Sequence, residues 1–390
     1  MRRYWFANDD IPMNILSRLP SKTLNSLKYV SRGWQNLISD RSFIKSQSKN
    51  TEPVSGFFFQ EIFQWADADN KSISYIPVDT ENSNIWRSVL NFLPEKVVIL
   101  SSNNGLLCCR SCLPTSQPMI YVCNPLNKQW TSLQWPILGR NSIIALAFDP
   151  IHDPIDVSTD FKLVAVSKMK VKEKVEEEEE EEEQSFFFDI YLSKTGSWIR
   201  SKEFCLCYHK ITKNKGILVQ GILYWLTDGN QILMFDPENE LSCLVMAPLP
   251  GTHFSSIPDL CIGESLGKLC YVVISEYGLQ LWVLEDYFAS EWELKISLSL
   301  QDWEKENSSV LYNIWEKMAG RVYGHMLPWV DPLAFKDGTL LLRVSVNVYS
   351  YQLDTRMMKK LCEVADLGPK SMFSPIVVPY SMSLVPLGET

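Results

Sequence analysis

Cysteine and histidine are the residues of this 390-residue chain that could hold a metal ion or act in catalysis. Cys109 and Cys112 form half of a zinc motif, but no second Cys or His pair follows at the spacing that a tetrahedral site needs. Cys205, Cys207 and His209 alternate along the chain, as residues on one side of a strand do. We interpret them as strand residues, with a structural metal as the minor alternative, and predict no metal site.

Two other chemical signatures are incomplete. The segment from Gly263 to Lys268 imitates a phosphate-binding loop, but it is one residue short, continues with Leu269 in place of Ser or Thr, and precedes no helix. The four histidines are isolated in sequence, so no nucleophile–histidine pair is visible; they are His152, His209, His253 and His325. The sequence therefore predicts a protein that is not an enzyme and has no cofactor.

The composition indicates a folded chain in a reducing compartment. Apolar residues make up 46% and charged residues 21%, which excludes a wholly disordered chain. No run of apolar residues is long enough to predict a membrane span, and the segment Met1–Asp10 lacks the apolar centre of a secretory signal. The cysteines lie mostly in apolar runs, so we interpret them as buried thiols and expect a cytoplasmic or nuclear location, or both.

The charge is divided between a basic head and an acidic body. Residues 1–50 contain nine Lys or Arg and three acidic residues, a net charge of +6. Since the whole chain carries −9, the rest of the chain carries −15. So few basic residues on an acidic body do not make a nucleic-acid-binding surface. They suit a head that docks on an acidic protein.

Residues 9–47 have the spacing of three short helices. The first presents an apolar face and has a proline in its first turn; its residues are Ile11, Pro12, Ile15, Leu16 and Leu19. Pro20 ends it. Ser21 and Ser31 stand at the expected N-caps of the second and third helices, and Asp40 opens a last turn. A bundle of this size cannot bury all of its apolar side chains. Either another protein covers the rest, or the chain's own body does.

The order of these residues resembles the F-box. The family pattern includes I-L-S-R-L-P, V-S-(K/R)-x-W-x-x-L-I and a trailing D-x-x-F, which stand here at residues 15–20, 30–38 and 40–43. The resemblance implies docking on a Skp-type adaptor, which links the chain to a cullin and a RING subunit. It implies an adaptor-binding set, undivided between core and contact, of Ile11, Pro12, Ile15, Leu16, Leu19, Pro20, Leu24, Leu27, Val30, Ser31, Trp34, Leu37 and Ile38. Trp34 and Pro20 are the expected anchors.

From about residue 55 the pattern changes to short β-branched and aromatic runs. A layout recurs: a glycine, a short apolar strand, and a second strand that ends in an Asn or Asp turn. It starts at Gly105, Gly221, Gly267 and Gly338, with further units at 161–191 and at Gly56. A spacing of about 50 residues is typical of kelch-like propeller blades. Because radial repetition hides strand edges, about six propeller units are favoured over a pair of β-sandwiches.

The body also resembles the F-box-associated domains that follow plant-type F-boxes, in the stretches 102–107, 124–130, 222–226 and 380–385. The predicted fold is therefore an α+β multidomain chain. It consists of a three-helix F-box at 1–47, a linker at 48–55 and an all-β, propeller-like domain at 56–390. The glutamates from Glu176 to Glu183 predict a solvated, disordered insertion at about 168–185.

The favoured function is a substrate-recognition subunit of an SCF-type cullin–RING ubiquitin ligase. Its F-box would hold the adaptor, and one rim of the propeller would hold an unidentified target protein, with no membrane or nucleic acid involved. The alternatives are a propeller enzyme and a non-ubiquitin scaffold that uses the helical head for self-association. Four loop aromatics could contact a target, but packing between blades is equally expected, so none is assigned: Trp65, Trp86, Trp315 and Trp329.

Overall fold

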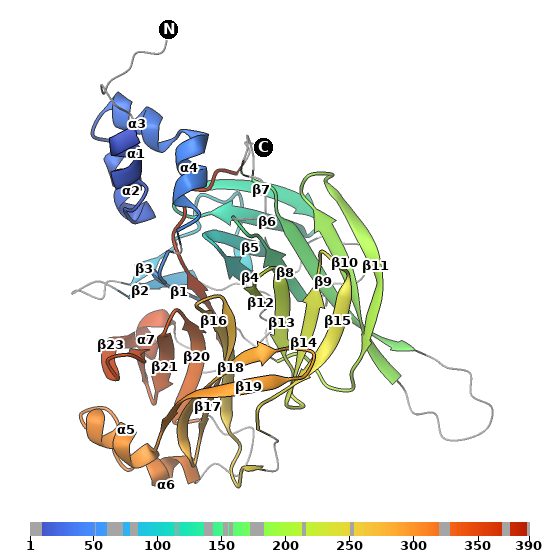
Figure 1. Cartoon of the computed structure of the whole chain (residues 1–390), viewed down its shortest axis with the longest axis vertical. Coiled ribbons are helices and arrows are strands. Elements are labelled where there is room, and N and C mark those ends of the chain that lie inside the picture. The colour runs from blue at the N-terminus through green and yellow to red at the C-terminus, as the bar shows by residue number, and fades with distance from the viewer. Residues whose placement is uncertain are drawn as a thin grey trace, which may run out of the picture.

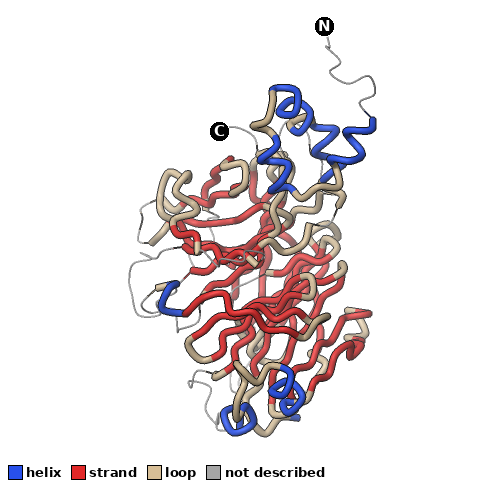
Figure 2. Tube along the Cα trace, turned by 90° about the vertical axis from the view of Figure 1, so that its left-hand side faces the viewer, coloured by secondary structure: helices blue, strands red, loops and turns tan. Residues whose placement is uncertain are grey.

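A cluster of short helices stands at one end of a body of β-sheets, as Figure 1 shows. This computed structural model describes residues 10–50, 52–60, 73–78, 85–113, 115, 117–135, 143–150, 155, 159–171, 183–212, 216–249, 253–319, 328–368 and 375–387. Figure 2 shows the strands filling the space between these helices and a smaller helical group at the other end. Within the described ranges, no helix is long and apolar enough to cross a membrane.

Four helices form the head: α1 (Asp10–Leu16), α2 (Ser21–Leu27), α3 (Arg32–Ile38) and α4 (Arg41–Gln47). Ser31 caps α3 as predicted, because its hydroxyl accepts a hydrogen bond from the N–H of Trp34 at 3.3 Å. The predicted last turn is a full fourth helix, capped by the Asp40 carboxylate, which accepts from the N–H of Ser42 at 2.9 Å.

The strands of the body group into four-stranded units. The first unit consists of β24 (Ile376–Tyr380), β1 (Gly56–Gln60), β2 (Ile73–Pro77) and β3 (Trp86–Arg87). The second consists of β4 (Val97–Asn103), β5 (Leu106–Ser111), β6 (Met119–Asn124) and β7 (Gln129–Gln134). The third consists of β8 (Ile143–Ala147), β9 (Lys162–Val171), β10 (Glu183–Leu192) and β11 (Ser197–Leu206).

The remaining strands repeat the same order. The fourth unit consists of β12 (Ile217–Val219), β13 (Ile222–Leu226), β14 (Gln231–Asp236) and β15 (Leu241–Met246). The fifth consists of β16 (Asp259–Ser265), β17 (Lys268–Ser275), β18 (Gly278–Asp286) and β19 (Glu291–Leu298). The sixth consists of β20 (Val330–Lys336), β21 (Thr339–Val344), β22 (Asn347–Gln352) and β23 (Met357–Glu363). Helices α5 (Leu300–Glu306), α6 (Ile314–Ala319) and α7 (Val364–Leu367) lie in the connections after β19 and β23.

The first strands of the units form a ring. β4 contacts β24 and β8, β12 contacts β8 and β16, and β20 contacts β16 and β24. The fifth and sixth units share one eight-stranded sheet because β16 and β20 pair in parallel at Gly263↔Phe335 and Glu264↔Lys336. β24 pairs with β1 from Gly56↔Tyr380 to Gln60↔Ile376, so the last strand completes the first unit. This arrangement confirms the predicted propeller-like fold.

The glycines that the sequence predicts at strand entries lie in tight hairpin turns. In four units the turn into the second strand has two residues with positive φ: Asn104-Gly105 (43°, 86°), Gln220-Gly221 (49°, 84°), Leu266-Gly267 (53°, 72°) and Asp337-Gly338 (49°, 73°). Positive φ at both positions defines a type I′ turn, whose twist matches that of the flanking strands. Glycine is favoured at the second position because it has no Cβ to clash.

The predicted bounds of the acidic insertion, about 168–185, include residues that belong to strands at both ends. β9 and β10 pair as far as Glu183↔Val171, Gln184↔Lys170 and Ser185↔Met169, so residues 168–171 and 183–185 belong to strands. The third unit therefore contains the glutamate tract between its second and third strands, as the layout predicts. Residues 172–182 lie outside the described residues.

Gly105 and Gly221 offer a matched test of how closely the C-terminal segment packs on a hairpin turn. Both have φ near +85°, but a Cβ on Gly105 would lie 2.1 Å from the Cβ of Ser383, whereas Gly221 has no atom within 4 Å. We expect Gly221→Ala to lower the unfolding free energy by about 1 kcal/mol, the cost of the left-handed backbone. Gly105→Ala should cost about 2–4 kcal/mol because it also displaces this segment. Urea unfolding measures both, and equal losses would contradict the close packing.

Candidate functional site

Part of the predicted adaptor-binding set forms the core of the head. Leu16, Leu24 and Ile38 are buried, and they share one hydrophobic cluster with Phe43 and Ile44 of α4. Four further members are half-buried and pack against that cluster: Leu19, Leu27, Trp34 and Leu37. Trp34, an expected anchor, therefore contributes to the fold of the head as well as to its surface.

The other described members lie at the surface of the head. Ile15 is 60% exposed and Val30 is 66% exposed, and Pro20 and Ser31 are exposed as well. Tyr29 is 87% exposed, and the sequence analysis missed it; the available signal was an aromatic residue directly before the V-S-R run. Two members, Ile11 and Pro12, lie on α1, but their side chains lie outside the described residues.

Ile15, Tyr29 and Val30 form what we call the exposed head residues. These side chains are exposed in the whole chain, with the propeller present. The propeller therefore does not cover them. Large apolar side chains that stay in water on so small a unit are typical of an interaction surface. The head therefore presents an apolar surface that a second molecule can bury.

The head is nevertheless anchored on the propeller through a shared core. The buried cluster that contains Leu16 and Leu24 continues into the second and third units and includes Leu384, Val385 and Leu387 of the C-terminal segment. In Figure 1 this segment, in red, passes beside α4. Burial of apolar surface on both sides of the junction holds the head in a fixed position.

Glu52, in the predicted linker, ties α2 to α4. Its Oε1 accepts hydrogen bonds from the backbone N–H of Ser21 at 2.7 Å, the hydroxyl of Ser21 at 2.9 Å and the side-chain amide of Gln47 at 2.7 Å. Pro20 holds the N-cap position of α2 and makes no side-chain cap. The sequence predicted Ser21 as the cap, whereas a carboxylate from beyond α4 satisfies the free N–H group instead.

A cavity of about 330 Å³ lies between the head and the propeller. It is lined by residues 47–50 and 52 of the head and linker and by the turns at 103–104, 220–221, 266–267 and 336–337. Val378 and Pro379 of β24 in the first unit, Asp149 and Pro150 of the third unit and residues 381–383 of the C-terminal segment also line it. Because all six units reach this cavity, it is the mouth of the propeller axis on the side of the head.

Asp337 is a strongly perturbed carboxyl at this mouth. Burial raises the pKa of Asp337 to about 6, and the charge of Glu264 adds to the increase, while Lys336 and a hydrogen bond from the Val54 backbone oppose it. The Oδ2 atom of Asp337 is buried and has no hydrogen-bond partner among the described residues. Lys336 lies 3.8 Å from Glu264, so the cation is shared between two carboxyls.

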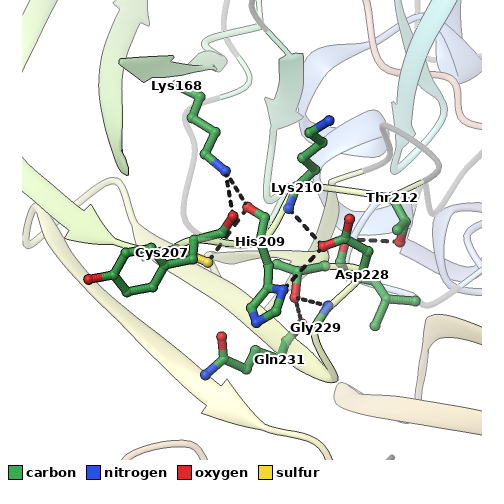
Figure 3. A network of polar contacts seen from close by, with 11 residues as sticks. Lys168, Cys207, His209, Lys210, Thr212, Asp228, Gly229 and Gln231 are labelled. Carbon is green, nitrogen blue, oxygen red and sulfur yellow. Dashed lines mark hydrogen bonds and ion pairs between the residues drawn. The ribbon is translucent and has the colours of Figure 1, made fainter. Parts of the chain in front are cut away.

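Cys207 and His209 belong to a polar network on the other side of the propeller, shown with its neighbours in Figure 3. The Cys207 thiol points to the His209 carbonyl at 3.8 Å, and His209 Nδ1 lies 3.4 Å from Asp228 Oδ1. Burial raises the pKa of Cys207, and it raises the pKa of Cys205 to about 12, so both stay protonated at neutral pH. Within the described residues no group of three His, Cys, Asp or Glu is placed to hold a metal ion.

This network fixes a loop against a neighbouring turn. Lys168 Nζ donates to the carbonyls of Tyr208 at 3.1 Å and His209 at 2.8 Å, and Asp228 accepts from the N–H of Lys210 at 2.9 Å. A Cβ on Gly229 would lie 2.0 Å from the His209 ring, so glycine is what allows the imidazole to pack there. Cys207 and His209, for which a structural metal was the minor alternative, are thus held in contacts with Asp228, Gly229 and Lys168.

Comparison with known proteins identifies the family. Residues 68–310 match a family described as "F-box protein At3g26010-like, beta-propeller", which is more than half of the chain. The chain belongs to this family. The F-box domain family matches residues 9–46, the segment that contains α1 to α4.

This chain is similar to F-box proteins of Arabidopsis thaliana, two of which match nearly its whole length. F-box protein At5g49610 is 25% identical over 370 residues, which cover 91% of each chain. F-box protein At5g07610 is 24% identical over 386 residues, covering 92% of this chain and 86% of its own. Putative F-box/kelch-repeat protein At1g20790 is 28% identical over 209 residues, half of this chain and 41% of its own. The predicted likeness to plant-type F-box proteins is thus confirmed.

Glu52 provides a test of the clamp inside the F-box. Glu52→Ala leaves the Ser21 N–H without its acceptor, and we expect a loss of about 1–2 kcal/mol in the local stability of α2. Glu52→Gln keeps one acceptor oxygen and should lose less. Amide hydrogen exchange measures protection in α2, with β17 as the internal reference. Unchanged exchange in α2 for Glu52→Ala would show that the clamp contributes nothing.

Asp337 provides a pH-dependent test of the axial mouth. Its pKa is higher in the folded protein than in the unfolded chain, so the charged form is disfavoured and stability falls as pH rises from about 4 to 6. Asp337→Asn removes this penalty and still suits the Asn-Gly turn. We expect the variant to match the wild type near pH 4 and to exceed it by about 1–2 kcal/mol above pH 7, with part of the shift discounted for solvent screening. A difference that is constant with pH in chemical unfolding would refute the assignment.

Proposed function

We propose that this F-box protein is the substrate-recognition subunit of an SCF-type cullin–RING ubiquitin ligase. The observation that carries the proposal is the exposure of Ile15, Tyr29 and Val30 within the segment that matches the F-box domain. They offer a partner exposed apolar side chains, one of which is aromatic. The partner is a Skp-type adaptor, through which the cullin and RING subunits join.

Charge supports the same partner. The head carries +6 over residues 1–50, so an acidic adaptor approaches it under attraction, whereas the acidic remainder of the chain disfavours docking of that adaptor elsewhere. Among the members whose side chains the structure describes, Ile15, Pro20 and Val30 are exposed and can touch the adaptor without unfolding the head. Ser31 is exposed, but its hydroxyl already caps α3.

The function needs no bond chemistry from this chain. A target protein held by the propeller has its lysines at high effective concentration near the charged ubiquitin-conjugating enzyme, and the ligase activity belongs to the assembled complex. The shared core supports this role because it joins the head to the propeller, while the Glu52 clamp holds α2 and α4 of the head together. The buried thiols fit a reducing compartment, so the complex would work in the cytoplasm, the nucleus or both.

Adaptor binding tests the proposal directly. Ile15→Asp and Val30→Asp place a charge on the exposed head residues without disturbing the core, and each should weaken the binding of a purified Skp-type adaptor at least tenfold. Ser46→Asp adds the same charge at an exposed position of α4 and serves as the matched control. Isothermal calorimetry gives the affinities, and thermal unfolding checks that each variant is folded.

The outcome also separates the proposal from self-association. A scaffold that uses the same apolar residues to pair two copies would form dimers that Val30→Asp dissociates, and it would not bind the adaptor. If the wild-type chain fails to bind the adaptor, or if both variants bind it as tightly as Ser46→Asp does, the receptor role is wrong.

A further inference from the structure

The longest helical insertion in the propeller lies on the side away from the head. The turn Leu266-Gly267 is on the head side of the fifth unit, because it lines the axial mouth with residues 47–50. From there β17, β18 and β19 alternate in direction, so β19 ends on the opposite side. Helices α5 and α6 follow β19, and Figure 1 places them at the far end of the molecule from α1 to α4.

This insertion is a rigid platform. Its apolar face is buried in the core of the fifth and sixth units through Leu300, Trp303, Leu311, Ile314 and Met318. Glu304 closes the connection between the two helices, because its carboxylate accepts from the N–H groups of Asn313 at 3.0 Å and Ile314 at 3.2 Å. Side chains on the outer face are therefore held in place by a well-packed base.

Two aromatic residues stand on the outer face of this platform. Tyr312 is 59% exposed and Trp315 is 62% exposed. The half-buried Trp329 packs edge-on against Tyr312 with ring centroids 5.7 Å apart, and its carbonyl accepts from the N–H of Ser345, next to the exposed Val346. Exposed aromatic clusters on rigid supports are typical of protein interaction sites.

The rings already bind a cation of the same chain. Lys317 Nζ lies 3.1 Å from the centroid of Tyr312 and 3.8 Å from that of Trp329. This Nζ atom is buried and has no hydrogen-bond partner among the described residues, so its charge is balanced by the two ring faces. With Lys317 covered, the exposed charged residues of the insertion between 300 and 318 are Asp302, Lys305, Glu306 and Glu316. Glu306 is paired with Arg356 at 3.0 Å.

We propose that the platform of Tyr312, Trp315 and Trp329 docks a basic segment of the target protein, with an Arg or Lys side chain stacked on Trp315. This inference rests on the proposed function, since it names where the receptor holds its target. Charge complementarity selects the occupant: Glu306 is held by Arg356, and of the remaining exposed charges on the insertion Asp302 and Glu316 are acidic and Lys305 is basic. A guanidinium stacked on the exposed Trp315 ring gains a cation–π contact there.

The test uses two fluorescent peptides of equal length, one alternating Arg and Gly and the other alternating Glu and Gly. Fluorescence anisotropy measures their binding to the purified full-length chain in complex with its adaptor, at physiological ionic strength. We expect the Arg peptide to bind and the Glu peptide not to bind. Trp315→Ala should weaken binding of the Arg peptide at least tenfold, and Tyr312→Ala should also weaken it.

Phe288→Ala is the matched control. Phe288 is 67% exposed in the turn between β18 and β19, on the head side of the same unit, and should not affect peptide binding. Preference for the Glu peptide, no binding of either peptide, or equal losses in Trp315→Ala and Phe288→Ala would overturn the inference. Adaptor affinity is measured on each variant as well. If a platform variant loses peptide binding but still binds the adaptor, the effect lies on the platform. If the chain binds the Arg peptide but not the adaptor, only the receptor role is contradicted.

Discussion

The pairing of β24 with β1 is the interaction on which the rest of this molecule depends. These strands lie at opposite ends of the chain, and their hydrogen bonds complete the first unit and close the ring of first strands. The closure also directs the residues after Tyr380 across the second unit. There Asn124 donates from Nδ2 to the carbonyls of Ser383 at 2.9 Å and Val385 at 2.8 Å.

The position of the head follows from this course of the chain. Leu384, Val385 and Leu387 enter the same hydrophobic cluster as the core of the F-box, so the C-terminal segment forms part of the seat of the head. The Glu52 carboxylate then joins α2 and α4 directly before the chain enters β1. Weakening of the ring closure would therefore loosen the head as well as the first unit, although the two lie in different domains.

Local signals in the sequence were sufficient for the elements and for their order. The glycines after Asn104, Gln220, Leu266 and Asp337 predict strand entries, because a type I′ turn needs positive φ at both of its central residues. This requirement depends only on neighbouring residues, so it can be read from the sequence. Ser31 was found as a cap for the same reason. The cap of α2 was missed because its acceptor, Glu52, is 31 residues away from Ser21.

Burial in the candidate site could not be predicted, because it depends on long-range packing. Leu16 and Ile15 are adjacent and both apolar, yet the first is in the core and the second is exposed. Helical periodicity placed both on one face, and only the positions of α4 and the C-terminal segment separate them. The sequence also could not tell that Trp315 is exposed while Trp329 is half-buried. Trp329 packs over Lys317, which lies 12 residues before it in the chain.

The division of charge gives the two binding surfaces opposite preferences. Under the proposed function, the basic head would attract an acidic adaptor, and the exposed carboxylates Asp302 and Glu316 on the far insertion would attract a basic target segment. A basic segment would be repelled from the head, so it would not compete with the adaptor for the exposed apolar residues there, and the adaptor would be repelled from the platform. Discrimination of this kind rests on unfavourable charge pairs as much as on favourable contacts. In a receptor of this kind, the net charge of −15 outside the head, eight units of which come from the glutamates at 176–183, would disfavour docking of an acidic adaptor anywhere but on the head.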